Sequence, residues 1–234
     1  MRVIRNKVLA MMLILQTVLG PEDLERVRVE CDALPWAPGK RTAGPAARGV
    51  KENLQADGGD PRTQALERFV REALERHPLF EIAARPQRFS RLLFSRYEPG
   101  MAYGAHTDDA LIGSGAGRVR TDLAFTLFLS ANASYEGGAL VVESALGEQE
   151  TRLEAGDAIL YPAGSVHRVT PVTRGVRLAA VGWVQSVIAD AGQRETLFEL
   201  SVARTRLAEA GAAREELLRL DKAVSNLLRM WAQL

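Results

Sequence analysis

Five short apolar segments in the middle of the sequence restrict the fold more than any other feature. Each is rich in β-branched, aromatic or aliphatic residues, and stretches with glycine, proline or asparagine separate them. No helical periodicity lies between them, which favours an antiparallel sandwich or barrel over alternating strands and helices. The segments are FSRLLFSRY (89–97), TDLAFTLFLS (121–130), GALVVES (138–144), DAILYP (157–162) and VRLAAVGWVQS (176–186).

Helical periodicity flanks this region on both sides. Apolar residues at three- and four-residue steps predict helices over 21–34 and 61–76, and a helical hairpin from residue 193 with a break near Gly211. The sequence is therefore predicted to be mainly β with flanking helices. Its expected regions are an N-terminal strand and helical support (1–80), a β domain (81–190) and a C-terminal helical extension (191–234).

The N-terminal region contains two less regular stretches. Residues 8–19 are mostly apolar but are interrupted by polar residues and too short to span a bilayer, so we interpret 13–18 as a first strand rather than a secretory signal. Either Met1 or Met12 can be the start. Residues 35–60 are rich in Gly, Pro and Ala and predict a long irregular connection. Lys51 and Asn53 in this stretch are polar residues that could reach a substrate, but we favour the interpretation that they belong to a solvated loop.

Bulk composition excludes several classes of function. With 234 residues, the chain can bury one good core. Its net charge of +1 is too small for a protein whose main role is to bind nucleic acid. A single cysteine, Cys31, excludes an internal disulfide and favours a cytoplasmic protein; its place in an amphipathic helix indicates a small buried side chain. No nucleic-acid or membrane partner is expected.

Two of the three histidines lie at the ends of predicted strands. In an extended strand, residues i and i+2 share a face, so His106 and Asp108 point together and Asp109 points away. His167 follows the turn after the strand 157–162. Two imidazoles and a carboxylate inside a small barrel form a facial triad that suits non-haem Fe(II). The same ligands bind other divalent metals, and spacing alone leaves a core histidine equally open.

An arginine begins the last apolar strand. Arg177 is expected to be costly to bury in a barrel unless it meets a carboxylate, which a guanidinium binds through two hydrogen bonds. The alternative is an ordinary surface arginine, the interpretation that we give to Arg174. A functional role for Arg177 is indicated only in combination with the two histidines and Asp108.

These motifs, in this order, resemble the bacterial PKHD-type hydroxylases. The resemblance runs from RYEPGMAYGAHTDDA (96–110) through YEGGALVVE (135–143) to LEAGDAILYPAGSVHRVTPVTRGVRLAAVGWVQS (153–186), and it covers nearly the whole chain from Met12. Members of this family are Fe(II)- and 2-oxoglutarate-dependent dioxygenases related to the catalytic domain of the procollagen prolyl and lysyl hydroxylases. The resemblance implies a double-stranded β-helix (jelly roll) core.

The resemblance also implies roles for individual residues. His106, Asp108 and His167 are expected to be the iron ligands, and Arg177 to bind the 5-carboxylate of 2-oxoglutarate; Tyr97 and Tyr103 are candidates for the cosubstrate pocket. The implied reaction uses O2 and couples decarboxylation of 2-oxoglutarate to hydroxylation of a small molecule or peptide. L-Ascorbate is the expected reductant.

Two alternative functions remain open at this point. One is a cupin-type dioxygenase that does not use 2-oxoglutarate, from which Arg177 distinguishes the leading hypothesis; the other is a non-catalytic binding module on the same barrel. The GSGAG stretch (113–117) lacks the context of a nucleotide-binding loop, and we expect it to form a lid beside the substrate entrance. The C-terminal hairpin is expected to pack on the barrel or on a partner chain, and the heptad-like spacing of its last helix would suit a dimer or trimer contact.

Overall fold

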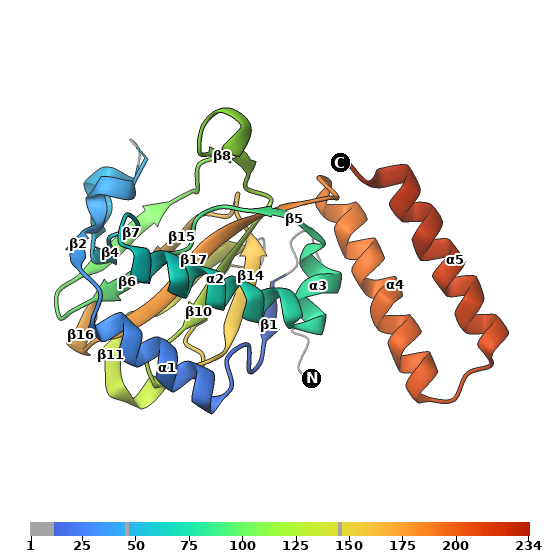
Figure 1. Cartoon of the computed structure of the whole chain (residues 1–234), viewed down its shortest axis with the longest axis horizontal. Helices are drawn as coiled ribbons and strands as arrows, with labels where there is room; N and C mark the ends of the chain where they lie inside the picture. Colours follow the sequence, from blue (N-terminus) through green and yellow to red (C-terminus); the bar gives the residue numbers. More distant parts are fainter. Residues whose placement is uncertain (1–11, 45–46, 145–146) are drawn as a thin grey trace.

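The computed structural model describes residues 12–44, 47–144 and 147–234 (Figure 1). Two antiparallel sheets form its body. The larger sheet has the order β1 (Leu13–Leu15), β14 (Ala158–Pro162), β10 (Leu123–Phe128), β17 (Arg177–Ser186), β6 (Leu93–Tyr97), β4 (Leu54–Ala56) and β2 (Trp36–Pro38), and β5 (Pro86–Phe89) also pairs with β17. The smaller has the order β13 (Gly147–Thr151), β12 (Leu140–Ser144), β15 (His167–Val169), β7 (Ala102–His106) and β3 (Lys51–Glu52).

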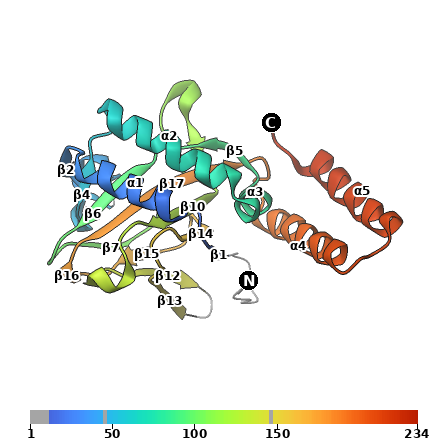
Figure 2. The ribbon, with the colours of Figure 1, turned by 60° about the horizontal axis from the view of Figure 1, so that its bottom comes forward.

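Two short ribbons and several helices complete the body. The ribbons pair β11 (Tyr135–Gly137) with β16 (Val172–Gly175) and β8 (Leu111–Ile112) with β9 (Val119–Arg120). Helices α1 (Pro21–Asp32), α2 (Pro61–Arg76) and α3 (Pro78–Ala84) cover the outer face of the larger sheet, while the smaller sheet lies on the other side (Figures 1 and 2). The predicted jelly-roll type of fold with flanking helices is confirmed.

The larger sheet is buried on both faces, and this explains the unbroken apolar character of its central strands. All six residues of β10 are buried, as expected where helices cover one face and a second sheet covers the other. On β17, alternate residues such as Ala180 and Val184 join the core beneath the helices. Residues of the opposite parity on this strand, including Arg177 and Trp183, face the space between the sheets, where they line a cavity.

The prediction of an irregular connection over residues 35–60 was wrong. It contains β2, β3 and β4, which extend both sheets, as well as two turns of 3-10 helix at Gly39–Thr42 and Arg48–Val50. Lys51 and Asn53 are correspondingly buried, with 4% and 5% exposure, rather than solvated. Strands of two or three residues are too short to show a clear hydrophobic period, so this region gave no strand pattern.

The helix predicted over 61–76 is confirmed, but the sequence did not predict the helix after it. His77 ends α2 and also begins α3, because its Nδ1 accepts a hydrogen bond from the Phe80 amide. Pro78 stands at the first position of α3, where its missing N–H is not needed. A proline that ends one helix thus begins another.

The C-terminal helical hairpin is confirmed. Helices α4 (Ala191–Glu209) and α5 (Arg214–Trp231) run antiparallel and extend away from the sheets (Figure 1), and Gly211 adopts a left-handed φ of 77° at the predicted break. Buried Arg194 anchors α4 by donating hydrogen bonds to the carbonyls of Ile188 and Ala189. Within the described residues, no helix combines the length and apolar character that a membrane span requires.

Candidate active site

Strand pairing in the smaller sheet brings two histidines together. His106 is the last residue of β7, His167 is the first of β15, and the two are direct partners in the antiparallel register. Their ring centroids are 4.3 Å apart. Asp108 follows two residues after His106, and its Oδ1 lies 3.7 Å from His167 Nε2. One potential ligand atom from each of the three residues lies within 4.8 Å of the other two.

Backbone carbonyls hold both imidazoles in a form that suits a metal. His106 Nδ1 donates to the Gly104 carbonyl at 2.8 Å, and His167 Nδ1 donates to the Ser165 carbonyl at 3.0 Å. In a neutral ring held in this way, Nε2 carries the lone pair that can bind a metal. Burial, helped by the neighbouring His167, lowers the pKa of His106 from 6.5 to about 4, which keeps the ring neutral at physiological pH. This donor set fits a divalent transition metal.

The structure places Asp108, and not Asp109, beside the histidines. The Asp108 side chain is 5% exposed, and its Oδ2 is buried without a hydrogen bond in the described part of the chain. Burial raises the pKa of Asp108, while His167 acts in the opposite direction. A buried carboxylate oxygen without a partner is expected where a cation binds. Asp109 is exposed and lies against Gly44, on another segment.

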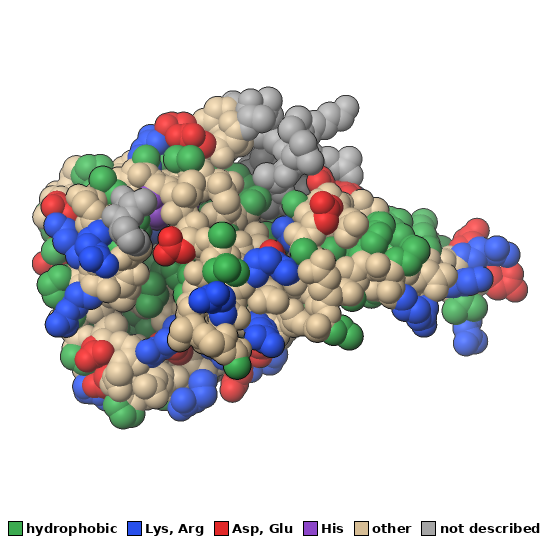
Figure 3. Space-filling view, turned by 90° about the horizontal axis from the view of Figure 1, so that it is seen from above, with side chains coloured by type: hydrophobic (Ala, Val, Ile, Leu, Met, Phe, Trp, Pro, Cys, Tyr) green, Lys and Arg blue, Asp and Glu red, His purple; other side chains and the backbone are tan. Residues whose placement is uncertain are grey.

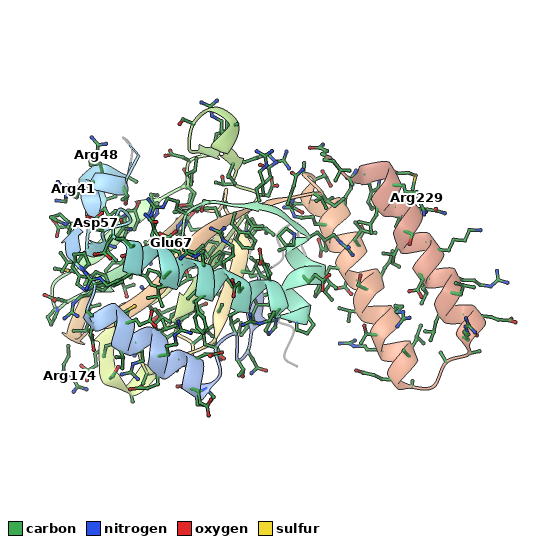
Figure 4. All side chains as sticks on the ribbon, in the orientation of Figure 1. Arg41, Arg48, Asp57, Glu67, Arg174 and Arg229 are labelled. Atoms are coloured by element: carbon green, nitrogen blue, oxygen red, sulfur yellow. The ribbon has the colours of Figure 1, made fainter. Side chains whose placement is uncertain are left out.

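Arg177 is a fully buried cation with unsatisfied hydrogen-bonding groups. Its side chain is 1% exposed, and the guanidinium carbon lies 5.2 Å from the Tyr97 ring centre and 5.4 Å from that of Phe128. Within the described residues, its Nε and Nη2 have no hydrogen-bond partner. Arg174, by contrast, points outward from the edge of the body (Figure 4) and pairs with Glu136 at 2.7 Å. The sequence-based distinction between these arginines agrees with their positions.

Both tyrosines singled out from the sequence line the same cavity but lie in different places. Tyr97 is buried and is the register partner of Arg177 across β6 and β17. Burial raises its pKa, so the phenol stays protonated. Tyr103 lies on β7 and stacks on His106, with ring centroids 3.7 Å apart. Tyr97 therefore adjoins the buried guanidinium, and Tyr103 supports one imidazole.

The His–Asp–His cluster, Arg177 and both tyrosines line one cavity of about 670 Å³ between the sheets, and Asp109 also reaches its lining. This size is typical of a small-molecule site. Both strands of the β8–β9 ribbon, with Gly113 and Gly117 between them, also line it. Lys51, Asn53 and Gln55 lie in its wall; sequence reasoning favoured a solvated loop for the first two and did not single out Gln55. A signal existed, because these three polar residues alternate along one strand-like stretch, but hydrophobic periodicity does not detect inward-facing polar side chains.

Lys51 differs electrostatically from the exposed cations. Its side chain is buried, and burial lowers its pKa from 10.5 to about 8, while Asp108 acts to raise it. The amine is thus mainly protonated at neutral pH. The cavity therefore holds two buried cations, Lys51 and Arg177, together with the His–Asp–His cluster.

Family models match most of the chain from its central strands onward. The 2OG-Fe(II) oxygenase superfamily model matches residues 92–185, and the model of the PKHD-type hydroxylase C-terminal domain matches 191–233. The first match includes the His–Asp–His cluster and Arg177. The second corresponds to the helical hairpin.

Similar proteins agree over nearly their full length. A PKHD-type hydroxylase of Picosynechococcus sp. is 50% identical over 216 residues, which cover 92% of this chain and 97% of the relative. One of Hyphomonas neptunium is 42% identical over 224 residues, covering 95% of this chain and all of the relative.

Solved structures share the fold at much lower identity. A Trichoplax adhaerens prolyl hydroxylase, solved with a peptide fragment of hypoxia inducible factor, superposes with a TM-score of 0.58 at 14% identity and covers 79% of this chain and 86% of its own. The non-haem alpha-ketoglutarate-dependent carbocyclase of nogalamycin biosynthesis gives 0.55 at 15% identity, covering 76% and 80%. With these matches, the chain belongs to the PKHD-type hydroxylases, a family of 2OG-Fe(II) oxygenases, and is an oxidoreductase.

Proposed function

We propose that His106, Asp108 and His167 bind the ferrous ion of this oxygenase and that Arg177 binds the distal carboxylate of 2-oxoglutarate. The observation that carries the proposal is the buried Arg177 guanidinium, whose free N–H groups line the same cavity as the histidine–aspartate cluster. A guanidinium buried without a carboxylate is costly, whereas its planar pair of donors matches a carboxylate.

The iron centre, 2-oxoglutarate and O2 together supply the oxidising power: 2-oxoglutarate is converted to succinate and CO2, and one oxygen atom enters the substrate. The chain's own residues perform the positioning. The His106 and His167 imidazoles and the Asp108 carboxylate would supply the protein ligands of the metal. Arg177 orients the cosubstrate through charge-assisted hydrogen bonds. Tyr97 packs beside it as a protonated phenol that can donate to the same carboxylate.

Titration calorimetry with Mn(II) as a redox-inert substitute tests this assignment. 2-Oxoglutarate is expected to bind the Mn(II)-loaded protein much more tightly than the metal-free protein, because the metal and Arg177 hold opposite ends of the molecule. Equal affinity in both states would contradict the proposal. A barrel dioxygenase that does not use 2-oxoglutarate would show no binding.

The proposal also covers the substrate, the reductant and the cellular location. The substrate is a small molecule or peptide, and L-ascorbate serves as the reductant that keeps iron ferrous, on the support of the family resemblance. Omission of ascorbate should shorten the time over which turnover is sustained. A cytoplasmic location is supported by the presence of one cysteine in the whole sequence. The net charge of +1 supports a substrate other than nucleic acid.

We also propose a homo-oligomer that forms through the C-terminal helices. No described residue of α5 is fully buried, and exposed apolar side chains include Leu218 and Met230, at 64% and 66% exposure. Figure 3 shows hydrophobic side chains on this extension. Light scattering should give a mass above that of one chain, and Leu218→Glu with Met230→Glu should reduce it. A monomer at micromolar concentration would contradict the proposal.

A further inference from the structure

Lys51 lies in the cavity wall beside the candidate metal cluster. It is 4% exposed and lies on edge strand β3, in register with Tyr103 of β7. Its Nζ is 5.1 Å from the centre of the Tyr103 ring, which also stacks on His106 at 3.7 Å. One tyrosine ring thus contacts both the ammonium group and a proposed metal ligand.

The Lys51 ammonium has unused hydrogen-bonding capacity. Its Nζ donates to Thr42 Oγ1 at 3.1 Å, and in the described part of the chain it forms no ion pair. An ammonium group carries three N–H donors, so two remain for a further acceptor. Asp108 is a nearby acidic group, but it belongs to the candidate metal cluster. Once Asp108 binds a metal, the buried ammonium group lacks a counter-charge of its own, which makes a purely structural role for Lys51 unfavourable.

Neutral polar groups surround this lysine. Thr42 Oγ1 lies within hydrogen-bond distance of Gln55 Oε1, and Gln55 Nε2 donates to Ser95 Oγ at 3.4 Å. All three side chains line the cavity. They hold Lys51 in place without neutralising it, and the wall therefore presents one positive charge amid neutral hydrogen-bonding groups.

The two buried cations belong to different sheets. Arg177 comes from β17 of the larger sheet and Lys51 from β3 of the smaller one, and both line the same cavity of about 670 Å³. Arg177 is already assigned to the cosubstrate. The cavity is large enough for a second small molecule beside 2-oxoglutarate.

We propose that Lys51 binds a carboxylate of the substrate, and that the substrate is a small carboxylic acid. This inference rests on the proposed function, because it assigns Arg177 to the cosubstrate. A single ammonium group matches the single charge of a carboxylate. A phosphate group carries up to two negative charges, so one of them would stay unpaired beside a single ammonium group among neutral side chains.

The test measures binding to protein loaded with Ni(II) and 2-oxoglutarate, so it does not depend on turnover. The probes are N-acetyl amino acids, which carry a carboxylate, and the matching N-acetyl amino acid amides, which are neutral. Thermal shift screening followed by calorimetry should find carboxylates that bind and amides of the same side chain that do not. Lys51→Met should weaken binding of these carboxylates by about 30-fold or more, as when one partner of a buried charge pair is removed. The carboxylate affinity of Lys51→Arg should fall between those of the wild-type protein and Lys51→Met.

Lys40→Met is the matched control. Lys40 is half-exposed and pairs with Glu52 at 3.6 Å on the neighbouring segment, so its loss should leave carboxylate binding unchanged. Circular dichroism checks that the Lys51 variants fold; if Lys51→Met does not, Lys51→Gln replaces it.

Three results would overturn the inference: amides that bind as tightly as carboxylates, no carboxylate binding at all, or Lys51→Met with wild-type affinity. A loss of 2-oxoglutarate affinity in Lys51→Met that equals the loss for the carboxylates would assign Lys51 to the cosubstrate instead. Failure of the proposed function is distinct, because it appears as wild-type protein that forms no succinate from 2-oxoglutarate.

Discussion

The Oδ1 atom of Asp108 lies 3.7 Å from Nε2 of His167, although the two residues are far apart in the sequence. Antiparallel pairing of β7 with β15 creates this proximity, since it sets His106 opposite His167 and carries Asp108 just past the end of the strand. The metal site is therefore a product of strand register, and a one-residue slip would turn its side chains to the other face.

The neighbouring aspartates should differ sharply in metal binding. Asp108→Ala removes a buried carboxylate from the cluster and should lower Mn(II) affinity by at least about 100-fold. Loss of a residue that only supports a metal ligand costs up to about 100-fold, and loss of a ligand itself should cost as much or more. Asp109→Ala should bind Mn(II) nearly as well as wild type, because Asp109 is exposed and lies against Gly44. Calorimetry measures both affinities. Similar losses in the two variants would mean that Asp109 takes part in the site.

Arginine substitutions should separate cosubstrate binding from surface charge. Arg177→Met should weaken 2-oxoglutarate binding to the Mn(II)-loaded protein by about 30-fold or more, because it leaves the distal carboxylate unpaired in a buried site. Arg177→Lys should recover part of this loss, since an ammonium group keeps the charge but not the planar pair of donors. Arg174→Met, at the exposed pair with Glu136, serves as the control. Unchanged affinity in Arg177→Met would exclude Arg177 from the cosubstrate site.

Cosubstrate binding should protect the β8–β9 ribbon from proteolysis. The ribbon lines the cavity, and Arg118 is exposed near its tip. If the ribbon acts as a lid, trypsin should cleave after Arg118 more slowly when Mn(II) and 2-oxoglutarate are present. Cleavage after Arg214, an exposed residue at the start of α5 and outside the cavity lining, should not change. Equal rates at Arg118 in both states would count against a lid.

Cys31 should be inert in the folded protein. It is fully buried in the core beneath the helices, and burial raises the pKa of its thiol to about 12, with smaller contributions from Asp32 and Glu30. Because the thiolate is the reactive form, a disulfide reagent at pH 8 should label the native protein very slowly and the urea-unfolded protein quickly. Rapid labelling of the native state would show that α1 is not packed as described.

Sequence patterns predicted the strands that have long apolar runs. The five central segments became β6, β10, β12, β14 and β17, because residues buried on one or both faces leave a strong hydrophobic signal. The short strands β2, β3 and β4 left none. Lys51 of β3, Gln55 of β4 and Asn53 between these strands line the cavity, and an alternation of polar residues is invisible to a hydrophobicity pattern.

Several residues of the candidate site could also be singled out from local sequence patterns. Strand parity distinguished Asp108 from Asp109, and the free-energy cost of burial distinguished Arg177 from Arg174. Parity did not supply the contact between Tyr103 and Lys51, because it depends on which edge strand pairs with β7. Pairing between strands distant in sequence is a tertiary property that local pattern does not contain.

The most direct test of the central claim is the conversion of 2-oxoglutarate to succinate by purified protein with Fe(II), ascorbate and O2, followed by mass spectrometry. Wild-type protein should form succinate even without added substrate, at a slow uncoupled rate. Asp108→Ala should form none above background, while Asp109→Ala should keep the wild-type rate. Absence of succinate with the wild-type protein, or an equal rate in Asp108→Ala, would contradict the assignment of His106, Asp108, His167 and Arg177 as the working site of this oxygenase.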